Sequence, residues 1–194
     1  MVIIGSAEMF KKVRKKFKSL QPFNLDNTFS DFGTCLHNPD KSLFLRRYSK
    51  KDIEKKMKKV RFIHHLKSLG FDDISITTEM DDACVHYLKV YNKEQKPDNL
   101  LFDLRVSESR FVPDKSFFKN EKDVIVYDMI VIEWMASQNP YINFNSEKPQ
   151  LPGQKYPGLG ILKYCFNMMY DTAKEISRDG FLDIPDHGHG AVMY

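Results

Sequence analysis

The chain has 194 residues, of which 42% are hydrophobic and 13% aromatic, so it can bury a sizeable core and does not have the composition of a disordered protein. Its formal net charge of +4 is only mildly basic, which argues against a dedicated nucleic-acid-binding protein and fits an anionic small ligand equally well. Three widely spaced cysteines, with no CxxC pair, indicate neither a disulfide framework nor a zinc site.

The apolar runs are shorter than a membrane span, and the apolar patch at the start is shorter than a signal-peptide core. Together with the cysteine pattern, this favours a cytoplasmic protein without membrane attachment.

The first part of the chain, residues 1–48, reads as a basic helix followed by an irregular segment. Residues 6–20, SAEMFKKVRKKFKSL, place apolar side chains at helical spacing, and Ser6 could cap that helix. Its lysine-rich face could contact RNA or a membrane, but a solvated face is the simpler interpretation. We expect this part to be an N-terminal helical extension of a domain that comprises residues 49–194.

A clearer helix is predicted over residues 49–70. Ser49 and Asp52 have the spacing of a capping box, and Gly70 is a natural helix stop. His64 and His65 are adjacent, so on a helix they point about 100° apart and are not expected to share a metal ion. One apolar stripe follows the helical period: Ile53, Met57, Val60, Ile63 and Leu66.

The hydrophobic period then changes from helical to alternating. Four strands are expected, over residues 73–78, 83–91, 100–107 and 123–136. In the second strand, His86, Leu88 and Val90 fall on one face while Tyr87 and Lys89 fall on the other. A loop over residues 137–156, a helix over about 158–178 and a short strand over 181–185 follow. Strands grouped before a helical crossover indicate an α+β domain around one mixed, mostly antiparallel sheet flanked by helices.

The loop before the last predicted helix has the composition of an anion-binding site. Lys155, Gly158 and Gly160 precede a first turn that contains no Asp or Glu to offset the positive end of the helix dipole. Glycines permit close backbone approach, and the N–H groups at a helix start are ready donors. A plain turn is the alternative. Neither the dinucleotide fingerprint, whose last glycine is replaced by Lys163, nor the GK[ST] phosphate loop is present.

The segments IEWMASQNP, KYPGLG and DGFLDIPDHGHGAVMY, taken in this order, resemble the GNAT superfamily of acetyl-CoA-dependent N-acetyltransferases over roughly residues 100–194. In that family an Arg or Gln, two residues and then Gly-x-Gly or Gly-x-Ala lie between the fourth strand and the third helix and hold the CoA pyrophosphate. Here Lys155 stands in place of the Arg or Gln, with Gln154 one residue early. His187 stands where the family has Asn, and the loop is longer than usual.

The resemblance implies acetyl transfer from acetyl-CoA, as cosubstrate, to a primary amine that attacks directly with the help of a carboxylate base. Tyr194 resembles the family's acid for the leaving thiolate. Because the family adds two more strands after this point, the chain is expected to have either a natively short C-terminus or a truncated one. The backbone of Met135, Ala136 and Ser137 would bind the pantetheine arm. The pyrophosphate would lie on Lys155, Tyr156, Pro157, Gly158, Leu159 and Gly160.

Glu133 is the expected base, because it is a lone carboxylate in an apolar run where desolvation would raise its pKa. The alternative is an ion pair with Arg105 across the sheet. Trp134 is expected to face the opposite side of the strand, in the core. Arg105, Glu108 and Arg110 could line the acceptor site or form a surface ion-pair cluster.

His187 and His189 form an HxH pair that could bind a metal ion, but no further ligands stand at a convincing spacing, so no metal site is predicted. A second functional class stays open: a catalytically inactive GNAT-like protein that binds CoA, or keeps only the scaffold, and acts through partners. A nucleic-acid role is the third, disfavoured interpretation. The amine acceptor is not identified, although the acidic turn EMDD (residues 79–82) hints at a cationic one, and a homodimer is possible.

Overall fold

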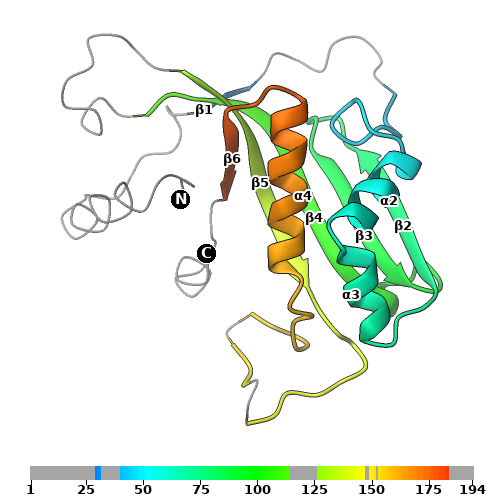
Figure 1. Ribbon diagram of the computed structural model, residues 1–194. Helices are drawn as coiled ribbons and strands as arrows, with labels where there is room; N and C mark the ends of the chain where they lie inside the picture. The colour runs from blue at the N-terminus through cyan, green and yellow to red at the C-terminus, as the bar shows by residue number, and fades with distance from the viewer. Residues whose placement is uncertain (1–28, 32–39, 114–125, 147–148, 152, 184–194) are drawn as a thin grey trace, which may run out of the picture. The chain divides into compact units, whose positions relative to one another are not determined.

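The computed structural model describes residues 29–31, 40–113, 126–146, 149–151 and 153–183 (Figure 1). The basic helix predicted over residues 6–20, the pair His187 and His189, and Tyr194 lie outside the described residues. The chain divides into two compact units. The described part of the smaller unit is residues 29–31, 108–113, 126–131 and 173–183. The described part of the larger unit is residues 40–107, 132–146, 149–151 and 153–172.

The described elements begin with a short strand, β1, in the segment that the sequence predicts to be irregular; it exists because it pairs with the end of β4. The rest follow the predicted order of helices, a run of strands, a loop, a helix and a strand. The helices are α2 (Lys50–Lys59), α3 (Phe62–Ser68) and α4 (Leu162–Glu175), with a 3-10 turn at Pro97–Asn99. The strands are β1 (Phe29–Asp31), β2 (Ile74–Met80), β3 (His86–Asn92), β4 (Leu100–Phe111), β5 (Tyr127–Ser137) and β6 (Gly180–Asp183).

The strands form one sheet in the order β2-β3-β4-β5-β6, with β1 paired to β4. The pairs β1–β4, β2–β3 and β3–β4 are antiparallel. In Figure 1, β5 and β6 run in the same direction, and α4 connects them in sequence. The fold is therefore α+β with a mixed sheet, as the sequence predicts.

The helix predicted over residues 49–70 is in fact two helices. The capping box is present: the Asp52 N–H donates to Ser49 Oγ at 3.3 Å, and Asp52 Oδ2 accepts from the Ser49 N–H at 3.2 Å. Arg61, however, adopts a left-handed conformation with φ of 64°, which ends α2 and starts α3. The break rotates the apolar stripe, so Phe62 is fully buried and Ile63 is only partly buried.

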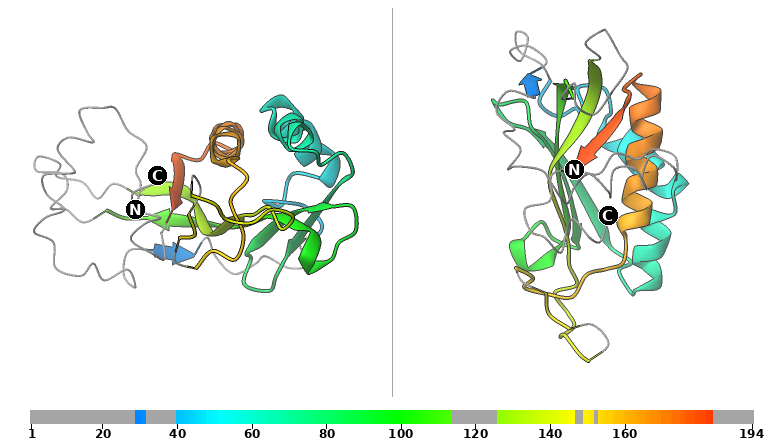
Figure 2. Two further views of the ribbon diagram at one scale, coloured as in Figure 1. Left: turned by 90° about the horizontal axis from the view of Figure 1, so that it is seen from below. Right: turned by 90° about the vertical axis from the view of Figure 1, so that its left-hand side faces the viewer.

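In the larger unit, the helices lie on one face of the sheet (Figure 2). The predicted alternation of β3 is confirmed, because His86, Leu88 and Val90 are at most 1% exposed while Tyr87 and Lys89 are partly exposed. The rings of Phe62 and Phe102 meet edge-on with centroids 5.3 Å apart, which joins α3 to β4. Burying such side chains stabilises the fold by about 1.5–3 kcal/mol each.

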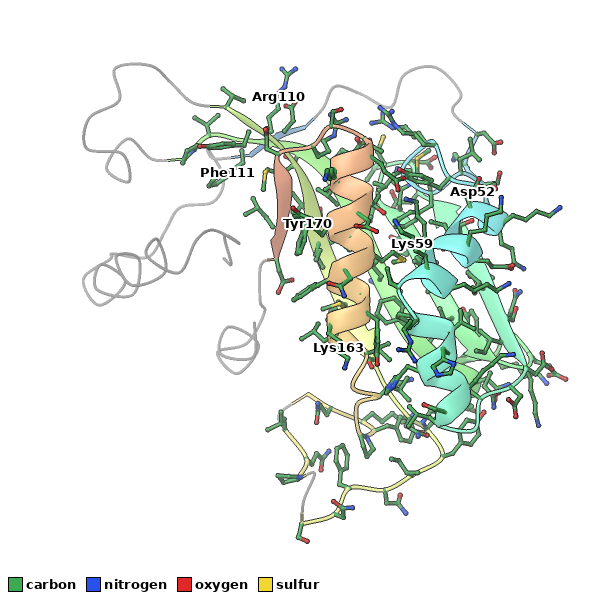
Figure 3. All side chains as sticks on the ribbon, viewed as in Figure 1. Asp52, Lys59, Arg110, Phe111, Lys163 and Tyr170 are labelled. Atoms are coloured by element: carbon green, nitrogen blue, oxygen red, sulfur yellow. The ribbon has the colours of Figure 1, made fainter. Side chains whose placement is uncertain are left out.

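Two polar contacts connect segments of this unit that are distant in sequence. Buried His86 accepts a hydrogen bond at Nδ1 from the Leu45 N–H at 3.1 Å, so the ring in the core has a partner. The helices α2 and α4 are joined at the surface, where Lys59 Nζ donates to Asp171 Oδ2 at 2.8 Å (Figure 3).

The smaller unit contains its own apolar cluster, formed by Phe111, Met129 and Leu182 with Tyr127 packed against it. Its charged groups are also paired. The Arg178 guanidinium donates to Glu108 Oε1 at 2.5 and 3.0 Å, and both side chains are largely buried, with exposed fractions of 12% and 4%.

The cysteine spacing, which indicated no disulfide framework, did not reveal that Cys84 is disulfide-bonded. Cys165 is a buried thiol on α4. The helices among the described residues are all too short or too polar to cross a membrane.

Candidate functional site

The glycine loop (residues 155–160) lies against the end of β5 in the larger unit. The Leu159 N–H donates to Ser137 Oγ at 3.2 Å, and the Asn139 N–H donates to the Pro157 carbonyl at 2.7 Å. A Cβ added to Gly158 would lie 3.6 Å from the Ser137 carbonyl oxygen. The strand end and the loop, which the sequence predicted as two separate parts of one site, therefore meet.

The glycine loop leads directly into α4, and the N-terminus of α4 has no side-chain cap. Gly160 has φ of +67°, a left-handed conformation that glycine adopts without steric cost. The Ile161 carbonyl accepts from the N–H groups of Tyr164 and Cys165 at 3.0 and 3.1 Å, which places Ile161 at the N-cap position of α4. An aliphatic side chain cannot accept a hydrogen bond, so it leaves the first N–H groups of α4 for other acceptors.

Two lysines flank this helix start. Lys155 is exposed on the loop, with Nζ 5.0 Å from the centroid of the Tyr156 ring. Lys163 is exposed on the first turn of α4, with Nζ 4.9 Å from the Tyr164 ring (Figure 3). The first turn carries no acidic residue, so both the dipole and the lysine charge are positive there. An anion bound at this point would be stabilised by both.

His65 is part of this arrangement, and the sequence analysis missed it. Its Nε2 lies 2.9 Å from the Leu159 carbonyl oxygen, and its ring lies 5.0 Å from that of Tyr164. The neighbouring His64 is exposed instead. A helix pattern alone carries no signal for a contact between residues so far apart in the chain.

Glu133 does not have the predicted environment. It is exposed rather than desolvated, and its Oε1 accepts from Ser107 Oγ at 2.5 Å. The predicted alternative, a pair with Arg105, is also not formed, since Arg105 bonds Asp103 at 2.9 Å. Trp134 is wrongly predicted as core: it is 42% exposed. The apolar run stays buried only through Ile132, and beyond it both Glu133 and Trp134 are exposed.

Met135, Ala136 and Ser137 continue β5 from Glu133 to the glycine loop, and all three are partly exposed. Four residues of extended strand span about 13 Å. The predicted base and the glycine loop are thus connected by one short stretch of β5.

The remaining predicted residues are engaged in ion pairs. Glu108 is paired with Arg178, and Arg110 Nε lies 3.7 Å from Asp128 Oδ1, so these two belong to ion pairs of the smaller unit. Arg105 belongs to the larger unit. Among the residues that the structure describes, no cluster of His, Cys, Asp and Glu could hold a metal ion.

No protein-family model, no curated protein and no solved structure matches this chain. The fold defines it as an α+β protein with a mixed sheet. A fold of this class is shared by proteins of many functions, so the site and not the fold carries the functional information.

Proposed function

We propose that the chain binds acyl-CoA and transfers the acyl group, acetyl in the simplest case, to a primary amine. The observation that carries this proposal is the hydrogen bond from the Leu159 N–H to Ser137 Oγ, which joins the end of β5 to the glycine loop directly before the uncapped start of α4. The order of strand, glycine loop, helix and strand also supports it, because the same segments resemble the GNAT superfamily.

The pyrophosphate is placed on the loop and the first turn of α4. Since the Leu159 N–H is engaged by Ser137, the expected donors are the N–H groups of Gly158, Gly160 and the first turn of α4. Lys155 and Lys163 provide the counter-charge. Met135 and Ala136 run from this point along β5 toward Glu133, so the pantetheine arm would follow the strand.

Acyl transfer then requires a neutral amine that attacks the thioester carbonyl carbon. The carbon–nitrogen bond forms, the carbon–sulfur bond breaks, and the amine gives up a proton. Glu133 accepts this proton in the proposal, and its exposed position allows the proton to pass on to solvent. The leaving thiolate takes up a proton from Tyr194, by the family resemblance, or from water.

Calorimetric titration of acetyl-CoA into the wild type, Gly158→Glu and Gly158→Ala tests the binding step. We expect saturable binding to the wild type and to Gly158→Ala, because the added Cβ makes only an ordinary contact 3.6 Å from Ser137 O. Gly158→Glu should abolish binding, since it adds a carboxylate beside the pyrophosphate. A folded wild type that does not bind acetyl-CoA would overturn the proposal.

A second candidate is a protein that binds CoA without catalysis and acts through partners. The exposed position of Glu133 favours it, because the case for Glu133 as a catalytic base assumed a desolvated carboxylate. Thiol release in the presence of a broad panel of amines distinguishes the two: binding without release would leave only this second candidate.

A further inference from the structure

Arg105 is held in a fixed orientation on the face of the sheet opposite the core helices. Its Nη2 donates to Asp103 Oδ2 at 2.9 Å, and the Asp103 side chain is only 7% exposed. The guanidinium carbon lies 5.5 Å from the Tyr87 ring centroid and 5.6 Å from that of Trp134. A buried carboxylate and two aromatic rings therefore restrict this arginine in three directions.

Asp103 takes one of the five N–H donors of this guanidinium. Within the described part of the chain, Arg105 Nε is buried and has no hydrogen-bond partner, so the donors left for a ligand are those of the two terminal nitrogens. The side chain is nevertheless 41% exposed, so a ligand can reach it. A pre-oriented arginine with spare donors is suited to a planar oxyanion, because its fork matches the two oxygens of a carboxylate.

Arg105 lies close to Glu133 on this face. Ser107, two residues further along β4, donates to Glu133 Oε1. Trp134, whose ring lies 5.6 Å from the Arg105 guanidinium carbon, directly follows Glu133 along β5, so the same part of β5 reaches both Arg105 and Ser107.

We infer that this face binds an amine that also carries a carboxylate, as an amino acid does, with the carboxylate on Arg105 and the amine toward Glu133. The inference rests on the proposed function, because it names the substrate class of that acyl transfer. The site discriminates by charge at each end: Glu133 repels an anion, and Arg105 repels a cation.

Other ligand classes fit less well. A purely cationic amine would be repelled by the positive charge of Arg105. It would also have to displace the guanidinium from the Tyr87 and Trp134 rings in order to contact them. A phosphate dianion would meet the negative charge of Asp103 next to the guanidinium and of Glu133 beyond it. Lys89, whose Nζ lies 5.5 Å from the Tyr87 ring, adds positive charge only at the Arg105 end.

The test is calorimetric titration of single L-amino acids and of their carboxamides into the full chain without acetyl-CoA. The carboxamides keep the amine and the side chain and remove the carboxylate. The variants are Arg105→Gln, Arg105→Lys, which keeps the charge without the fork, and the control Arg110→Gln, an exposed arginine on the same strand. Circular dichroism verifies that each variant is folded.

We expect at least one amino acid to bind the wild type and Arg110→Gln equally. Its carboxamide, and the same amino acid on Arg105→Gln, should each bind at least about tenfold more weakly, with Arg105→Lys between them. Equal binding by the carboxamide, equal binding by folded Arg105→Gln, or no binding of any amino acid at millimolar concentration would overturn the inference.

The same inference can fail separately from the proposed function. Amino-acid binding through Arg105 without acyl transfer would leave this site in place and reject the transferase. Acyl transfer only to amines without a carboxylate would keep the transferase and reject the site.

Discussion

The Nε2 of His65 on α3 lies 2.9 Å from the carbonyl oxygen of Leu159 in the glycine loop. The N–H of the same residue, Leu159, bonds Ser137 at the end of β5. The loop is therefore held from both sides, by a helix and by a strand. Its position at the start of α4 depends on contacts between segments that are remote in sequence.

Replacing His65 by alanine should loosen the glycine loop. One hydrogen bond of this kind contributes about 0.5–1.5 kcal/mol, so acetyl-CoA affinity should fall about threefold to tenfold. His65→Gln, whose amide can still donate to Leu159 O, should recover most of the affinity. Calorimetry measures the affinity, and amide hydrogen exchange at Leu159 measures the loop itself. Unchanged exchange in His65→Ala would show that the contact does not hold the loop.

The two loop glycines should respond differently to alanine. Gly160 has φ of +67°, a conformation that costs a residue with a Cβ about 1 kcal/mol, so Gly160→Ala should lower the free energy of unfolding by about that amount. Gly158→Ala should change it by less than about 0.5 kcal/mol. Urea denaturation of both variants measures this difference, and equal losses would contradict it.

Phe62 should be a main determinant of stability in the larger unit. Its side chain is fully buried, and its ring packs against Phe102, so Phe62→Ala should lower the free energy of unfolding by about 3–5 kcal/mol. Leu69, at the end of α3, is 43% exposed and serves as the control. Leu69→Ala should cost less than about 1 kcal/mol, and a similar cost for both variants would contradict the packing.

Glu133→Gln tests the proposed base without altering the shape of the site. If Glu133 accepts the proton of the amine, the turnover rate should fall by about 100-fold or more while acetyl-CoA affinity stays the same. Steady-state thiol release and calorimetry give the two quantities separately. Turnover that persists in Glu133→Gln would assign the base elsewhere, and a matched Ser107→Ala variant shows what loss of the Ser107 hydrogen bond alone does.

Asp81 should make stability depend on pH in the acid range. Burial raises the pKa of Asp81, but bonds from the Tyr87 hydroxyl and from the N–H groups of Val85 and Ala83 outweigh it, so the pKa lies below its ordinary 3.8. A carboxyl with a lowered folded pKa stabilises the fold above its unfolded pKa, and this stability is lost as the pH falls through the folded pKa. The same bond raises the pKa of Tyr87 above 10.0.

Thermal unfolding of the wild type and Asp81→Asn as a function of pH measures this contribution. The wild type should have the higher Tm near neutral pH, and the two values should converge as the pH falls well below 3.8. A difference in Tm that stays constant down to about pH 2 would show that Asp81 stabilises the fold independently of its charge.

Local patterns in the sequence determined the features that depend on neighbouring residues. The capping box of Ser49 and Asp52 formed as predicted, because both its hydrogen bonds join residues three positions apart. The buried face of β3 followed from alternation, because successive side chains of a strand point to opposite faces. The order of strands, glycine loop and α4 was predicted for the same reason, as periodicity and turn residues are local signals.

Tertiary structure alone decided the features that depend on distant partners. The left-handed Arg61 divides one predicted helix into two and buries Phe62, although no residue there signals a turn. Glu133 lies in an apolar sequence, but its exposure is set by what packs around the end of β5. His65 reached the glycine loop only because α3 and α4 cover the same face of the sheet (Figure 2). Burial and hydrogen-bond partners are properties of the packed chain, so no local pattern could specify them.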